Sequence, residues 1–130
     1  MAKKNDLIIG VDFDGTVVTH EFPKIGTALA DAVEWMKTLD KAGAKLVLNT
    51  MRSGKELDDA VKWFERRNIP LYGVNENPDQ KNWTKSPKVY AHVYVDDAAV
   101  GCPCVSPSDG SKKYVDWSKV GPILMDMIND

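Results

Sequence analysis

The sequence lacks the long apolar runs that mark a membrane protein. No run is long enough to cross a bilayer. The first one, Leu7 to Val11, spans five residues and is followed by an acid, so it is too short to serve as a signal peptide. We therefore expect a cytoplasmic protein that has no membrane partner.

Cysteine and histidine are scarce, with two residues of each type. Cys102 and Cys104 are separated by one residue, a spacing that suits an ordinary disulfide poorly. They form at most half of a zinc site, because His20 and His92 do not lie at ligand spacing from them. Free loop thiols in a reducing cytoplasm are the favoured interpretation, and metal binding by the pair is the alternative.

A strong excess of charge is also missing, since the net charge is −2 and the sequence pI is about 5.7. This balance offers no general attraction to nucleic acid or to anionic membranes, and it leaves only a local basic patch as a route to nucleic acid. The 130 residues, of which 43% are hydrophobic, suit one domain over residues 1–130 that buries its core without metal or disulfide.

Apolar runs and amphipathic segments alternate along the chain. They predict, in order, strand 7–11, helix 29–43, strand 45–49, helix 53–68 opened by a Ser53–Glu56 capping box, strand 69–74, a polar segment 75–87, strand 89–95, a loop 102–110 and helix 118–128. This order predicts an α/β fold, a three-layer Rossmann-like parallel sheet with helices on both faces. We expect its core at residues 7–100, followed by a C-terminal loop and helix at 101–130.

Polar residues follow three of these strands where each strand ends: Asp12, Asp14, Thr50, Arg52, Asp96 and Asp97. The carboxyl ends of parallel strands share one edge of the sheet, where ligands bind. Carboxylates held close together repel one another unless a cation is present, and oxygen ligands suit Mg²⁺. The sequence therefore predicts a magnesium and phosphate site at this edge, completed by Lys85 or Lys88.

Each of these residues also has a purely structural interpretation. An Asp-x-Asp-Gly segment is common in turns, and Thr50 is well placed to cap a helix. The Asp96–Asp97 pair could lie in a solvated loop, and Arg52 and Lys88 could be surface residues. Their conjunction at successive strand ends favours the functional interpretation.

In this order the motifs resemble those of the haloacid dehalogenase (HAD) superfamily of phosphotransferases, over residues 7–100. The resemblance is carried by Val11-Asp12-Phe13-Asp14-Gly15-Thr16-Val17, Leu46-Val47-Leu48-Asn49-Thr50, Lys88 with Lys85 as its competitor, and Val93-Tyr94-Val95-Asp96-Asp97. Residues 50–54 and 74–78 are also similar to segments of small bacterial and phage HAD-like hydrolases.

The resemblance implies a Mg²⁺-dependent phosphomonoester phosphatase that acts through an aspartyl-phosphate. Asp12 would be the nucleophile and Asp14 the general acid and base. The acid at Asp14 favours phosphoester hydrolysis, because dehalogenases of the superfamily lack it. Asp12, the backbone carbonyl of Asp14, Asp96 and, directly or through water, Asp97 would hold the ion.

The phosphoryl oxygens would be held by Thr50 and Lys88, and Arg52 would contact a phosphate or carboxylate of the substrate. Neither gap between the motifs has room for a cap domain, so the resemblance implies an open site. Such a site takes a phosphorylated small molecule or macromolecular end, or is closed by a second subunit. Residues 19–25 would form a small flap, and Trp83 is expected to be a packing anchor, with stacking on a substrate ring as the alternative.

Two rival functions stay open at this point. A phosphate-binding or regulatory protein on the same fold would keep these residues without turnover. A receiver-type signalling domain fits less well, because its phosphorylated aspartate follows the third strand, and here that strand ends in Tyr72-Gly73-Val74-Asn75.

Overall fold

Four parallel strands form the centre of the molecule. The computed structural model describes residues 7–130. The strands are β1 (Ile8–Val11), β2 (Lys45–Leu48), β3 (Gly73–Val74) and β4 (Val93–Val95), in the sheet order β3-β2-β1-β4. Ile9 pairs with Leu46 on one side and with Val93 on the other, so β1 is a central strand. The predicted Rossmann-like parallel sheet is confirmed.

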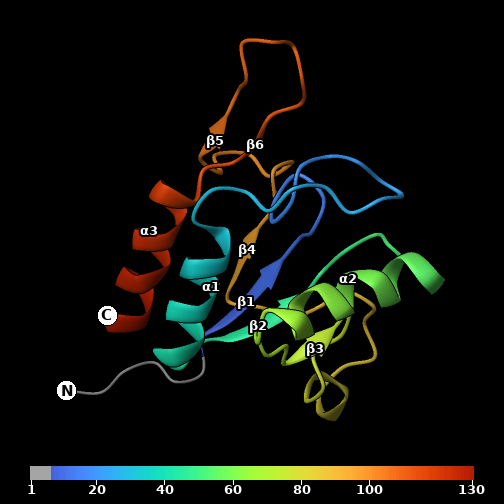
Figure 1. The fold of residues 1–130 in the computed structure, drawn as a ribbon. Coiled ribbons are helices and arrows are strands. Elements are labelled where there is room, and N and C mark those ends of the chain that lie inside the picture. Colours follow the sequence, from blue (N-terminus) through green and yellow to red (C-terminus); the bar gives the residue numbers. More distant parts are fainter. Residues whose placement is uncertain (1–6) are drawn as a thin grey trace.

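Helices cover both faces of this sheet, as predicted (Figure 1). Helices α1 (Ala32–Lys41) and α3 (Trp117–Asn129) pack together on one face, and α2 (Gly54–Arg66) lies on the other. Helical spacing of apolar residues explains these contacts, since the buried side chains recur three or four positions apart. They are Ala32, Met36 and Leu39 in α1, and Ala60, Trp63 and Phe64 in α2.

Within residues 7–130 no inserted domain interrupts the core, which matches the expected absence of a cap. No helix in that range combines the length and the apolar character that crossing a membrane requires.

Several local predictions were wrong. Ser53 precedes α2, but its side chain makes no capping hydrogen bond, because Gly54 directly after it adopts a left-handed backbone conformation with φ 54°. Strand β4 begins at Val93 instead of residue 89, since the preceding residues are held in a loop by hydrogen bonds from Gln80. Trp83 is 58% exposed and its ring lies edge-to-face with that of Tyr90, so it is not a packing anchor.

The predicted C-terminal loop contains an antiparallel hairpin of β5 (Cys104–Val105) and β6 (Tyr114–Val115). These strands are too short to show the alternating pattern that predicts a strand. Both cysteines are half-buried free thiols. The hairpin leads into α3, whose Trp117, Val120, Leu124 and Ile128 lie in the same hydrophobic core as the sheet. The core therefore extends beyond residue 100.

Contact between α1 and α3 depends on a glycine. A Cβ added at Gly121 would lie 2.1 Å from Cδ2 of Trp35 on α1. No side chain fits in that space, so Gly121 allows the two helices to approach each other closely.

We expect Gly121→Ala to lower the free energy of unfolding by about 1–3 kcal/mol, as overpacking does. In a Trp35→Leu background the same change should become neutral or stabilise by up to about 1 kcal/mol, because alanine favours a helix. Urea denaturation of the four proteins in this cycle tests the contact. Equal effects of Gly121→Ala in both backgrounds would contradict it.

Candidate active site

Three aspartates, the acid trio of Asp12, Asp96 and Asp97, come together where β1 and β4 end. Val11 pairs with Val95 in parallel register, so the next residue of each strand leaves the sheet at the same edge. The backbone N–H of Asp12 donates to the carbonyl of Val95 at 3.0 Å and extends this register. One carboxylate oxygen of each member lies within 4.8 Å of the others. The structure thus brings together three of the four carboxylates that we expected to converge.

Thr16 connects two members of the trio through its hydroxyl. Its buried hydroxyl lies 3.1 Å from Oδ1 of Asp97 and 3.4 Å from Oδ2 of Asp12, and it accepts a hydrogen bond from the backbone N–H of Asp97 at 3.1 Å. The backbone carbonyl of Thr16 accepts from the buried indole N–H of Trp117 at 2.7 Å. The sequence prediction did not assign Thr16 to the site, although Thr16 ends the Asp12-Phe13-Asp14-Gly15-Thr16 segment that follows β1.

The environment of Asp12 changes its acidity. Burial, and after it the neighbouring charges of Asp96 and Asp97, together raise the pKa of Asp12 from 3.8 to about 7. A cation among these oxygens would offset both effects. Three carboxylates at this separation form a hard, anionic donor set, and that chemistry fits Mg²⁺.

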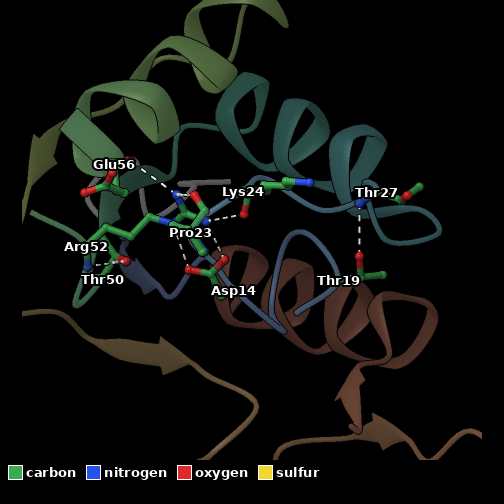
Figure 2. Close-up of polar contacts among 8 residues, drawn as sticks. All are labelled: Asp14, Thr19, Pro23, Lys24, Thr27, Thr50, Arg52 and Glu56. Atoms are coloured by element: carbon green, nitrogen blue, oxygen red, sulfur yellow. Dashed lines mark hydrogen bonds and ion pairs between the residues drawn. The ribbon is translucent and has the colours of Figure 1, made fainter. Parts of the chain in front are cut away.

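Asp14 lies outside the trio, because its side chain is held by Arg52 (Figure 2). Nε and Nη2 of Arg52 donate to the two carboxylate oxygens at 2.8 and 2.7 Å. The remaining N–H groups donate to the backbone carbonyls of Pro23, Lys24 and Glu56 at 3.2, 2.8 and 3.3 Å. All five guanidinium donors are therefore used within the protein.

This arrangement corrects one of the two interpretations of Arg52 and leaves the other a prediction. The residue is 3% exposed, so it is not a solvated surface arginine. Its guanidinium has no donor left for a phosphate oxygen, so this geometry does not support the predicted substrate contact. Arg52 instead joins Asp14 to residues 19–25, the expected flap. The backbone carbonyl of Asp14 as a metal ligand stays a prediction.

Thr50 follows the end of β2, and Lys88 lies in the loop before β4. The Thr50 hydroxyl accepts a hydrogen bond from the backbone N–H of Arg52 at 3.1 Å. The backbone N–H of Thr50 donates to Oδ1 of Asn75 at 2.8 Å. Lys88 shares a cavity of about 500 Å³ with Asp96, whereas Lys85 lines a different cavity. The geometry therefore favours Lys88 over Lys85 as the lysine of the site.

His20 is a neighbour of the trio that sequence reasoning did not assign beyond the flap. Its Nε2 lies 3.2 Å from Oδ2 of Asp97. Gly15 makes room for this contact, because it has φ 81° and a Cβ there would lie 2.1 Å from the same nitrogen. Thr19 closes the base of the flap by accepting from the N–H of Thr27 at 3.0 Å, as Figure 2 shows.

Fold and site together define a small Rossmann-like α/β protein with an aspartate cluster at the carboxyl edge of its sheet. A solved structure described as that of a conserved protein coded by a locus from Bacteroides thetaiotaomicron is similar to it, with a TM-score of 0.77 and 31% sequence identity. The match covers 98% of this chain and 93% of that one. The chain therefore belongs to the same family as this conserved protein. No protein-family model and no curated protein sequence matches it.

We expect Arg52→Met to lower the free energy of unfolding by about 3 kcal/mol or more, because it leaves the Asp14 carboxylate and three backbone carbonyls without their donor. Arg52→Lys should recover only part of this loss, since one ammonium cannot replace a five-donor fork. Urea denaturation measures both. Arg66→Met, at an exposed position on α2, is the matched control. A cost no larger than that of the control would show that the contacts of Arg52 are not structural.

A second prediction concerns pH in the absence of divalent metal. The unfolded chain ionises Asp12 near its ordinary pKa of 3.8, whereas the folded protein does so near 7. The stability that the raised pKa provides is therefore present below about pH 4 and is lost as the pH rises towards 7.

The free energy of unfolding of the wild type should fall relative to that of Asp12→Asn over this interval, and the difference should then stay constant. Denaturation of both proteins in EDTA across this pH range measures it, and Mg²⁺ should narrow the difference above about pH 7. Parallel stability curves between these limits would contradict the shift.

Proposed function

We propose that the protein is a Mg²⁺-dependent phosphohydrolase that acts on phosphomonoesters through an aspartyl-phosphate on Asp12. The observation that carries this proposal is the acid trio at adjoining strand ends, with a fourth carboxylate, Asp14, two residues from the nucleophile. The motif order that resembles the HAD superfamily supports the same reaction.

In the first step a carboxylate oxygen of Asp12 would form a bond to phosphorus while the bond from phosphorus to the leaving oxygen breaks. Asp14 would give that oxygen its proton. In the second step water would attack the aspartyl-phosphate and lose a proton to Asp14, which releases inorganic phosphate and restores the Asp12 carboxylate. Thr50 and Lys88 would hold the phosphoryl oxygens.

Asp12, Asp96 and Asp97 would hold Mg²⁺, which when bound offsets the repulsion between a carboxylate nucleophile and a phosphate dianion. Thr16 keeps Asp12 and Asp97 at their present separation, so these carboxylates are arranged before any ligand arrives.

The ion pair between Arg52 and Asp14 adds a requirement to this mechanism. Protonation of Asp14 gives up its ion pair with the guanidinium, whose two hydrogen bonds are short. We therefore expect Arg52 to withdraw from at least one oxygen of Asp14 during turnover. The same observation favours a second candidate function, a phosphate-binding protein in which Asp14 stays paired and no turnover occurs.

Hydrolysis of para-nitrophenyl phosphate tests the proposal. We expect turnover with Mg²⁺, none with EDTA, and loss to background in Asp12→Asn. Asp14→Asn should slow the reaction by about a hundredfold or more, the usual contribution of a general acid and base.

Asp58→Asn, which removes an exposed acid on α2, is the control and should keep full activity. When the protein is denatured during turnover of a substrate with a radiolabelled phosphate, the label should stay on the wild-type protein. Activity that survives in Asp12→Asn would exclude the aspartyl-phosphate, and phosphate binding without turnover would favour the second candidate.

A further inference from the structure

Residues 80–95, which run from the short helix η1 (Gln80–Asn82) to the end of β4, differ in composition from the rest of the chain. They contain three lysines, two tyrosines, one tryptophan and no acid, although the net charge of the chain is −2. The aromatic side chains are not buried: Trp83 is 58%, Tyr90 41% and Tyr94 37% exposed. Exposed aromatic residues that gather in one place mark binding surfaces.

These side chains form one feature, the aromatic–lysine groove, defined by Trp83, Lys88, Tyr90 and Tyr94, which line a cavity of about 360 Å³. The ring centroids of Trp83 and Tyr90 lie 5.7 Å apart in an edge-to-face arrangement. Nζ of Lys88 lies 5.8 Å from the centre of the Tyr94 ring. The groove therefore offers ring faces and a cation within the same space.

Buried polar side chains hold the groove in shape. Gln80, which is 7% exposed, accepts from the N–H of Tyr90 at 2.7 Å and donates to the carbonyl of Lys88 at 2.6 Å. Asn77, which is 5% exposed, donates to the carbonyl of Tyr90 at 3.2 Å. The Tyr94 hydroxyl donates to the carbonyl of Val89 at 2.5 Å. The loop is thus fixed from below while its rings face solvent, which lowers the entropy cost of binding.

The groove also leads towards the acid trio. A neighbouring cavity of about 500 Å³ shares Lys88 and Tyr94 with it and includes Asp96. Lys81 and Lys85 line a third cavity, which shares Gln80, Thr84 and Ser86 with the groove. Positive charge therefore continues along the same surface.

We propose that the aromatic–lysine groove binds single-stranded nucleic acid. Bases would stack on Trp83 and Tyr90, which any base can do because each has a flat π face. Backbone phosphates would meet Lys81, Lys85 and Lys88. A strand that follows the groove would bring a terminal phosphate to Asp96. This last step rests on the proposed function, whereas binding in the groove does not.

Fluorescence anisotropy with unphosphorylated, labelled DNA and RNA oligonucleotides of about ten nucleotides tests the groove in EDTA, where no turnover is expected. We expect at least one of the two to bind, and Trp83→Ala to weaken that binding by about tenfold. Trp83→Phe keeps a ring and should recover most of the affinity. Ile123→Ala, at a residue 50% exposed on α3, is the control and should not change it.

Lys85→Ala should lower the slope of log affinity against log salt concentration by about one, because one fewer counterion is released on binding. Binding of polyglutamate or of duplex DNA as tight as that of the single strand would overturn the inference, and so would unchanged binding in Trp83→Ala. The proposed function is judged separately by hydrolysis of para-nitrophenyl phosphate, which needs neither Trp83 nor Lys85, the two residues changed here. Absence of that turnover would leave the oligonucleotide result intact. Absence of oligonucleotide binding would likewise leave the turnover result intact.

Discussion

Repulsion among three carboxylates at the ends of two neighbouring strands is the constraint on which the site depends. The register of β1 against β4 places Asp12 beside Asp96, and the next residue, Asp97, joins them. A core with no need for charge at this edge would gain nothing from this arrangement, in which burial first and then the charges of Asp96 and Asp97 raise the pKa of Asp12 to about 7. The contacts of Thr16 and His20 with these carboxylates hold them close together although they repel one another.

The fold sorts four acids into two environments. Three have carboxylate oxygens within 4.8 Å of one another, whereas Asp14, two residues from Asp12, forms an ion pair with a buried arginine whose every donor is engaged. Because the same guanidinium also binds the carbonyls of Pro23 and Lys24, the state of Asp14 and the position of the flap are coupled. Loss of the Asp14 carboxylate would therefore remove a partner of the guanidinium that also binds the flap.

The sequence predicted the sheet, its flanking helices and the convergence of the strand ends, because β1 and β2 are continuous apolar runs and α1 and α2 have regular helical periods. It could not predict the partner of Asp14, since the ion pair spans 38 positions and Arg52 has no local pattern that separates a buried side chain from an exposed one. The hairpin of β5 and β6 was missed because each strand has two residues. Trp83 was misjudged because tryptophan is usually buried, and only the tertiary structure shows that it is not.

Two contacts from the C-terminal residues fix the turn that carries the site. The N–H of Val115 donates to the carbonyl of Gly15 at 3.0 Å, and the indole of Trp117 binds the next carbonyl, that of Thr16. Both contacts reach the turn that carries Asp12 and Asp14, from a segment about a hundred positions away in the chain. A larger protein could fix this turn with an added domain. Here Val115 on β6 and Trp117 on α3 do so. The flap therefore meets the trio at Asp97, through His20, and the cavity next to the aromatic–lysine groove meets it at Asp96.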